Sequence, residues 1–256
     1  MPAGLSATAR AWAPVPIDPP AVLLAVSIAV MPSALATHAG GSAANAPAAP
    51  GPAAATATAA PESKVLLSVI RLLSSAPDDA RRAVALNPAG TVAYVVNAGA
   101  GTVTPVNTAN TTAGAAIAVG GAPSAIAVTP DGKTAFVANS GTDNVTPIDL
   151  ANNTAGAAIA VGDAPSAIGI TPDGKTAYVA NNGADTVTPI DVAARTAGAT
   201  IAVGDGPSGI AVTPDGARAF VAVNGDNHVA VIDVKTWQVS KTLATGTGPD
   251  GMAWVR

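Results

Sequence analysis

The sequence predicts an all-β fold built from repeated units, and three observations support this prediction. A turn-forming proline recurs at intervals of 42 residues, at Pro88, Pro130, Pro172 and Pro214. Clusters of Gly, Asn and Asp divide each interval further, so that turn signals follow one another every 8–12 residues or so, a spacing typical of all-β proteins. The segments between turns alternate small and bulky apolar residues with a period of two, which excludes a helical solenoid.

Each unit has room for four strands, as the second copy illustrates. We expect strands over residues 124–128, 134–138, 144–149 and 157–161. Pro130 opens the turn between the first two strands, because proline presets the φ that such a turn requires. Four strands in about 40–45 residues is the size of a β-propeller blade. We therefore predict β-propeller blades of four antiparallel strands, in about four 42-residue repeats.

A proline stands inside the third strand of the first three units, at Pro105, Pro147 and Pro189. Proline cannot donate a hydrogen bond to a sheet ladder. We therefore expect the fourth strand of these units to be loosely attached or bulged beside the proline. The last unit has Val231 at this position.

Composition and segment boundaries suggest four regions along the chain. Residues 1–36 are predicted to be a signal peptide, because the apolar run at 21–31 is followed by a small-residue cleavage pattern. The alternative is a chance apolar run at a wrongly assigned start. Residues 37–62 are predicted to be a disordered linker rich in Ala and Pro, and 63–81 an extra strand or short helix. Residues 82–256 hold the β-propeller repeats.

The predicted signal peptide implies a secreted or cell-envelope-associated protein. We expect no transmembrane segment in the mature chain, because the run at 21–31 is too short to span a bilayer. The abundance of Ala, Gly and Pro is typical of a GC-rich bacterial genome.

Charge and motif content narrow the possible functions. The net charge is −4 with only 11% charged residues, so no nucleic-acid partner is expected. The absence of cysteine from the sequence excludes disulfides, cysteine–zinc sites and thiol nucleophiles. None of the HExxH, GxSxG, Walker or Rossmann patterns occurs. We therefore assign no catalytic residue, metal ligand or cofactor.

The repeat motif resembles that of the YVTN-repeat β-propellers, relatives of the cytochrome-d1-type and lactonase-type propellers. The resemblance rests on 130–133 (Pro-Asp-Gly-Lys), 136–139 (Phe-Val-Ala-Asn, where the family has Tyr-Val-Thr-Asn), Ile148-Asp149, and the loop from Val161 to Pro165. It covers about 82–256. The last copy departs from the pattern, with Val223 at the Asn position.

The resemblance implies a ring, which in this family normally has about seven blades. The sequence contains four units and a further first strand at 251–255. Three arrangements remain open: an open arc, a small closed ring, and closure by self-association through exposed blade edges. We favour an incomplete or oligomer-closed propeller.

The candidate binding residues are turn residues that we expect on one face of the propeller. The loop before each first strand and the turn between the second and third strands should meet there. The candidates are Ser124, Asp163, Ser166, Asp205, Ser208, Asp226, His228 and Asp250, with Asp143, Asp185 and Asp226 nearer the rim. Oxygen ligands in such number suit a cation such as Ca²⁺ or a small polar ligand. The plainer interpretation, which we favour, is that these residues simply form turns.

Two further features have structural interpretations. Asp149, Asp191 and Asp233 end the third strands and are expected to anchor the following turn through Asx-type hydrogen bonds. Trp237 either anchors a partner from an exposed position or packs on the last strand, and we favour packing.

These observations lead to a functional hypothesis with two alternatives. We expect a non-catalytic secreted scaffold that binds an unknown protein or small ligand through variable loops on a repeated frame. One alternative is a lactonase-like or metal-binding propeller enzyme. The other is a truncated propeller remnant with little activity.

Overall fold

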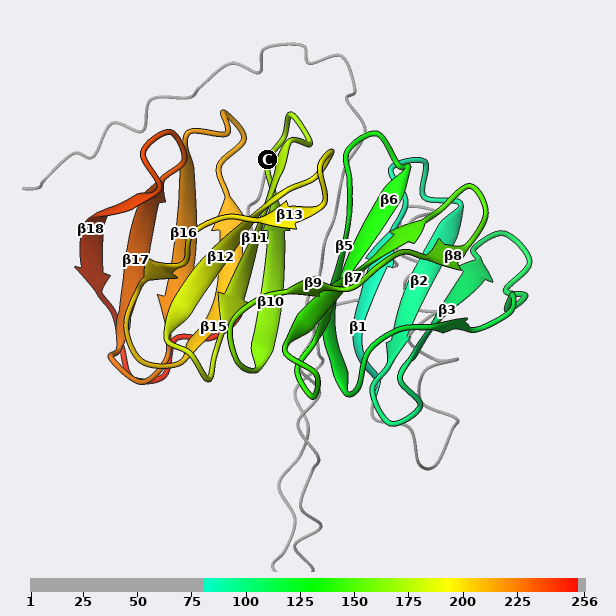
Figure 1. Cartoon of the computed structure of the whole chain (residues 1–256), viewed down its shortest axis with the longest axis horizontal. Helices are drawn as coiled ribbons and strands as arrows, with labels where there is room; N and C mark the ends of the chain where they lie inside the picture. The colour runs from blue at the N-terminus through cyan, green and yellow to red at the C-terminus, as the bar shows by residue number, and fades with distance from the viewer. Residues whose placement is uncertain (1–80, 253–256) are drawn as a thin grey trace, which may run out of the picture.

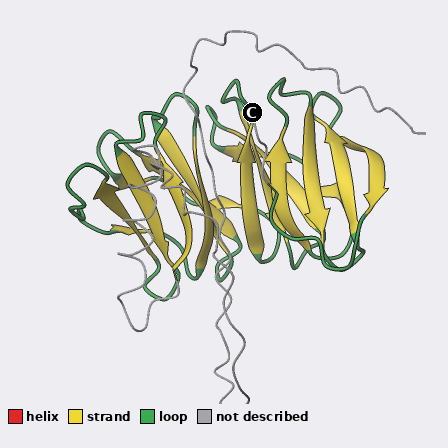
Figure 2. Cartoon of the chain, turned by 180° about the vertical axis from the view of Figure 1, so that it is seen from behind, coloured by secondary structure: helices red, strands yellow, loops and turns green. Residues whose placement is uncertain are grey.

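The computed structural model describes residues 81–252, in which the regular secondary structure is entirely β-strand (Figure 2). The predicted signal peptide, the linker and nearly all of the segment 63–81 lie outside the described residues, as do 253–256. The described strands form four antiparallel sheets that follow one another along the chain (Figure 1). We call these sheets the first to fourth blades.

Each blade runs outward from an inner strand through two middle strands to an outer one. The inner strands are β1 (Arg81–Leu86), β5 (Pro123–Val128), β10 (Pro165–Ile170) and β15 (Pro207–Val212). The second strands are β2 (Val92–Asn97), β6 (Thr134–Asn139), β11 (Thr176–Asn181) and β16 (Arg218–Val223). The third strands are β3 (Thr102–Asn107), β7 (Asn144–Asp149), β12 (Thr186–Asp191) and β17 (His228–Asp233).

The outer strands differ between blades. They are β4 (Ile117–Ala118), the pair β8 (Thr154–Ala155) and β9 (Ile159–Ala160), the pair β13 (Thr196–Ala197) and β14 (Ile201–Ala202), and the single strand β18 (Gln238–Ala244). The predicted all-β fold with four-stranded propeller blades is therefore confirmed, and the first three strands of the second unit lie within one residue of their predicted bounds.

The predicted effect of the strand prolines is also confirmed. In the second blade, β8 pairs with the end of β7 and β9 with its beginning, so Pro147 lies opposite a gap in the outer strand. Within that gap the Gly156 amide donates to the Pro147 carbonyl at 2.7 Å. In the fourth blade, Val231 replaces the proline, and β18 pairs with β17 along its length with one bulge.

The core lies between blades rather than within one sheet. Phe136 of the second blade is fully buried and shares a cluster with Ala177 and Val179 of the third. Tyr178 has the same position one blade later and packs in a cluster with Ala219 and Val221. Large side chains on one face thus meet small or branched ones on the next, which allows closely spaced blades.

Successive inner strands contact one another, β1 with β5, β5 with β10, and β10 with β15. No comparable contact joins β15 to β1 among the described residues. Within the range 81–252 the four blades therefore form an open arrangement, in agreement with the predicted incomplete propeller (Figure 1).

Candidate binding face

The loops before the inner strands and the turns between the second and third strands lie together, as the sequence predicts. In the second blade the Ser140 amide donates to the Ala122 carbonyl at 3.1 Å, and the Gly141 amide donates to the Gly121 carbonyl at 3.0 Å. The third and fourth blades repeat both bonds. This end of the blades is called the loop face below.

A side chain in each of the turns of the second, third and fourth blades also holds the loop that follows that blade. Asp143 Oδ1 accepts from the Ala164 amide at 2.8 Å, and Asp185 Oδ1 accepts from the Gly206 amide at 3.0 Å. In the fourth blade this position is Asn227, whose Oδ1 accepts from the Gly248 amide at 2.8 Å. Asp226, the residue predicted from the sequence, precedes Asn227 by one position, whereas the 42-residue spacing points to Asn227.

The three candidate serines connect neighbouring blades. Ser124 Oγ donates to the Pro165 carbonyl at 2.6 Å. Ser166 and Ser208 repeat this bond to Pro207 and Pro249, at 2.9 and 3.1 Å. The pairing of each inner strand with its neighbour shifts register at the serine. Each hydroxyl also reaches a carbonyl of its own blade, that of Ala138 at 3.3 Å for Ser124, so the bulge places it between the two blades.

The remaining candidates lie in and around the same loops. Asp163, Asp205, Asp226 and Asp250 are exposed. Asp226 Oδ2 accepts from the Asp205 amide at 2.9 Å, and His228 Nε2 lies 3.1 Å from the Val203 carbonyl oxygen. Within residues 81–252, no three His, Asp or Glu side chains converge closely enough to hold a metal ion.

The predicted Asx turns are present at the opposite ends of the blades. Asp149 Oδ1 accepts from the Ala151 amide at 2.8 Å, and Asp233 Oδ1 accepts from the Lys235 amide at 2.9 Å, two residues on in both cases. Asp191 Oδ1 instead accepts from the Ala194 amide, three residues on, at 2.7 Å. The backbone hydrogen bond from Ala151 holds the pKa of Asp149 below its usual range, and the one from Thr236 does the same for Asp233. Both carboxylates therefore stabilise the turns that follow the third strands.

A buried amide network that the sequence analysis missed lies beneath the loop face. Asn139 Nδ2 donates to Thr146 Oγ1 at 2.9 Å and to Asn144 Oδ1 at 2.8 Å. Asn181 makes the equivalent bond to Thr188 at 2.8 Å. The signal was present in the sequence as an Asn and a Thr seven residues apart in each of the first three units.

Trp237 packs against the third blade, and its packing on the last strand stays a prediction. It occupies the turn between β17 and β18 with a positive φ of 55° and is 38% exposed. A Cβ added to Gly198, in the outer-strand gap of the third blade, would lie 2.8 Å from Trp237 Cζ3. The ring therefore covers that gap from the neighbouring blade. Beneath it, burial raises the pKa of Tyr178 to about 12.

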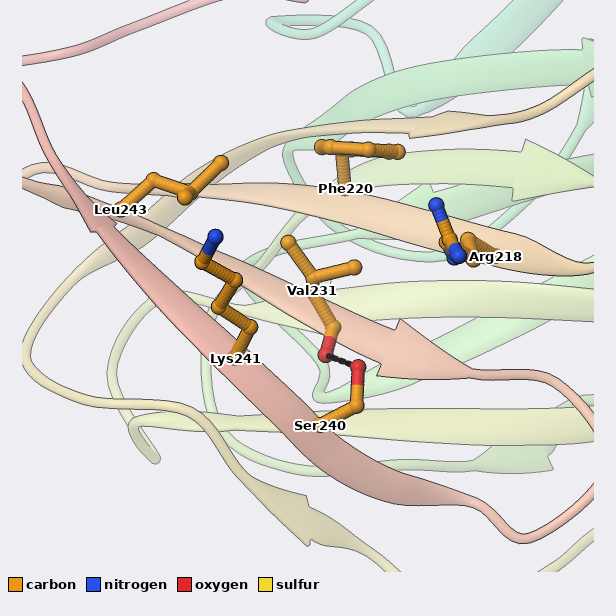
Figure 3. A pocket seen from close by; sticks show the side chains of 6 residues that line it. All are labelled: Arg218, Phe220, Val231, Ser240, Lys241 and Leu243. Atoms are coloured by element: carbon orange, nitrogen blue, oxygen red, sulfur yellow. Dashed lines mark hydrogen bonds between the residues drawn. The ribbon is translucent and has the colours of Figure 1, made fainter.

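Two grooves lie away from the loop face. One of about 400 Å³ is on the fourth blade, and its walls are Arg218, Phe220, Val231, Ser240, Lys241 and Leu243 (Figure 3). The other, of about 260 Å³, lies between the first two blades near Tyr94 and Asn153. None of the eight candidate binding residues lines either groove. The described part of the chain contains no helix suited to crossing a membrane.

The repeat, the four-stranded sheets and their packing define the chain as a β-propeller repeat protein. The family model of YNCE-like β-propellers matches residues 136–256. This match, with propeller-containing structural neighbours, confirms the resemblance to the YVTN-repeat, cytochrome-d1-like propellers. No curated protein sequence matches the chain.

Two solved structures are similar to the described fold. Hydrazine synthase from Kuenenia stuttgartiensis is 32% identical with a TM-score of 0.60, and the match covers 62% of this chain and 47% of that one. A functionally unknown protein from Desulfotomaculum acetoxidans is 22% identical with a TM-score of 0.59, over 70% of this chain and 62% of that one. The chain therefore spans only about half to three fifths of these relatives.

Proposed function

We propose that the chain is a non-catalytic binding scaffold that acts outside the cytoplasm. This proposal rests on the loop face, where some polar side chains hold the blades and loops together and others are exposed. The serine hydroxyls and the carboxylates of Asp143 and Asp185 hold the frame together. Asp163, Asp205 and Asp250 are exposed in loops whose backbone is held by that frame.

The expected ligand is a basic protein segment or a cationic small molecule. Four exposed carboxylates, those of Asp163, Asp205, Asp226 and Asp250, lie in or beside the loops of this face. Complementary charge increases the association rate and selects the partner. Such a role needs no acid–base pair, because the frame only has to present side chains.

The decisive experiment neutralises the exposed loop carboxylates. The parent chain and a variant with Asp163→Asn, Asp205→Asn and Asp250→Asn are each titrated with a Lys-rich peptide and with Ca²⁺. Both proteins are also assayed for lactone hydrolysis. We expect the peptide to bind the parent chain and to lose roughly tenfold or more in affinity for the variant, since each charge contact contributes on the order of 1 kcal/mol.

A matched control removes the same charge from the other end of the blades. Asp149→Asn, Asp191→Asn and Asp233→Asn preserve the Asx turns, because Asn107 already accepts from the Ala109 amide at 2.9 Å in the first blade. This control should bind the peptide as the parent does. If the parent chain hydrolyses lactones and the loop variant does not, the chain is instead an enzyme.

Export is proposed from the sequence of the N-terminal region. The apolar run at 21–31 precedes the small residues Ala34 and Ala36. A reporter fused after residue 62 should reach the medium or the cell envelope, and Leu24→Arg should retain it inside. Equal retention of both fusions would contradict export.

A further inference from the structure

The outer-strand gaps of the first three blades have the same construction. In each gap a glycine donates its amide to the carbonyl of the strand proline: Gly114 to Pro105 at 2.7 Å, Gly156 to Pro147 at 2.7 Å, and Gly198 to Pro189 at 2.8 Å. The cross-strand neighbour of each proline is aromatic: Tyr94, Phe136 and Tyr178. Cross-strand neighbours lie on one face of the sheet, so each gap combines a glycine, a proline and an aromatic side chain.

A side chain of the following blade covers the second and third gaps. A Cβ added to Gly156 would lie 3.0 Å from Arg195 Nη1, and one added to Gly198 would lie 2.8 Å from Trp237 Cζ3. Arg195 and Trp237 are equivalent residues of the turn after the third strand, and each has a positive φ of 55°. This turn therefore places its side chain over the gap of the preceding blade.

The first gap has no such cover. The equivalent turn residue of the second blade is Asn153, whose φ of 53° matches but whose side chain is short. The three atoms nearest to a Cβ added to Gly114 all belong to Pro105. The groove of about 260 Å³ lies at this place, with Tyr94, Pro105, Gly114 and Asn153 in its walls. It is thus the one of these three gaps that is left as a groove.

The residues of the first gap match those of the gap that Trp237 covers. They recur two repeats later in the same order, Tyr94 as Tyr178, Pro105 as Pro189 and Gly114 as Gly198. The gap that Arg195 covers has Phe136 in place of the tyrosine. The occupant that the protein itself places over a Tyr-Pro-Gly gap is therefore an indole ring.

Charge also favours a neutral ring over a guanidinium group. The backbone hydrogen bond from Ala151 lowers the pKa of Asp149, and the charge of Arg195 adds to this effect, so Arg195 lies near a carboxylate. The equivalent residue at the first gap is the uncharged Asn107, which lines the groove. The groove is lined by no charged residue. A cation there would lack the partner that Arg195 has.

The Tyr94 hydroxyl offers a polar contact for an indole N–H. Tyr94 is only 3% exposed, and burial raises its pKa. Burial also raises the pKa of Tyr178, but there the indole of Trp237 acts in the opposite direction as a polar neighbour. An indole in the first gap would give Tyr94 the same neighbour, and a tryptophan N–H usually finds such a partner when buried.

We propose that the groove between the first two blades binds the side chain of an exposed tryptophan on a partner protein. Its indole would lie over Gly114 and Pro105, as that of Trp237 lies over Gly198 and Pro189. A single buried tryptophan can provide much of the affinity of an interface. The site is separate from the loop face, because none of the candidate binding residues lines the groove, and it does not rest on the function proposed above.

The test uses capped tripeptides as probes with the whole chain. Acetyl-Gly-Trp-Gly-amide is compared with the corresponding Leu and Arg peptides and with free indole, and binding is followed by NMR at the Gly114 amide. We expect the Trp peptide to shift this signal at the lowest concentration. An equal response to the Leu or Arg peptide, or tighter binding of free indole than of the Trp peptide, would overturn the proposal.

Three variants identify the groove as the site. Asn153→Trp should cover the gap from within and weaken binding of the Trp peptide roughly tenfold or more. Thr111→Trp is the matched control: it adds the same ring at the equivalent turn of the first blade, with φ of 58°, where no described blade precedes, and should leave binding unchanged. Trp237→Asn should open the third gap, so that the peptide shifts the Gly198 amide as well.

Each variant can contradict the proposal. Unchanged binding by Asn153→Trp would place the peptide elsewhere on the chain. Equal weakening by Asn153→Trp and Thr111→Trp would remove the groove as the cause. Should Asn153→Trp not fold, the Trp237→Asn variant still decides, because no response of the Gly198 amide would show that an uncovered Tyr-Pro-Gly gap does not bind an indole.

Discussion

The third and fourth blades have the same frame but differ at three linked places. The third blade has Pro189 in β12 and a two-piece outer strand, whereas the fourth has Val231 and a continuous β18. The third buries the hydrogen-bonded pair Asn181 and Thr188. The fourth has apolar Val223 and Ala230 at both of those positions.

The residues at these two positions change together between the blades, from Asn181 and Thr188 to Val223 and Ala230, and we expect them to act as a pair. In the polar pair the Asn181 amide N–H donates to the Thr188 hydroxyl, although Asn181 Oδ1 has no hydrogen-bond partner among the described residues. An apolar pair needs no partner, so either kind of pair is tolerated. A mixed pair leaves one polar group without its partner. The strand proline similarly coincides with a broken outer strand beside it, whereas Val231 lies opposite a continuous one.

The largest expected effect comes from the aromatic residue between blades. Tyr178→Ala should lower the free energy of unfolding by about 3–5 kcal/mol, because it opens a cavity in a fully buried interface. Phe220→Ala at the equivalent position of the fourth blade, where the ring is only partly buried, should cost about half as much. Urea unfolding measures both.

Tyr178→Phe is the control for this comparison. The Tyr178 hydroxyl is buried with the Trp237 indole N–H as a polar neighbour, but the two do not form a hydrogen bond of regular geometry. Phe136 already fills this position in the second blade. Stability should therefore be kept or increased. Similar losses for Tyr178→Ala and Phe220→Ala would show that the two faces are equally covered.

The next effect tests the strand proline. Val231→Pro should break the pairing of β18 with β17 near Lys241 and cost about 2–3 kcal/mol, because a ladder bond is lost and the ring constrains the strand. Hydrogen exchange at residues 241–244 should accelerate. Pro189→Val in the third blade is the reciprocal change and should slow hydrogen exchange near Gly198. Unchanged exchange in both variants would show that the proline does not cause the break in the outer strand.

A smaller effect is expected from the buried amide. Asn181→Val alone should cost about 1–3 kcal/mol, because the Thr188 hydroxyl loses its donor while it remains buried. The double variant Asn181→Val with Thr188→Ala reproduces the fourth blade and should recover much of that loss. A double-mutant cycle from thermal unfolding gives the coupling, and additive losses would contradict paired action.

The smallest effect is the response to acid. The pKa values of Asp149 and Asp233 are lowered in the folded chain, so their contribution is present above the unfolded value near pH 4 and is lost as the pH falls through the folded value. The first blade has uncharged Asn107 in the equivalent turn. Amide exchange at Ala151 should therefore accelerate below about pH 4 relative to exchange at Ala109, and parallel behaviour of the two amides would refute this assignment.

The sequence by itself determined the features that depend on local chemistry and period. The 42-residue spacing located the blades, turn residues located the strands, and Pro147 marked the break in the outer strand. The Asx turns at Asp149 and its equivalents followed for the same reason, since such turns involve only neighbouring residues.

Only the tertiary structure decided which groups meet across blades. The bond from Ser124 to Pro165 spans 41 residues, Trp237 covers a gap in the preceding blade, and the groove beside β18 needs three strands. Each of these depends on the distance and register between sheets. Those quantities are set by the summed packing of the interblade core, which no single stretch of sequence contains.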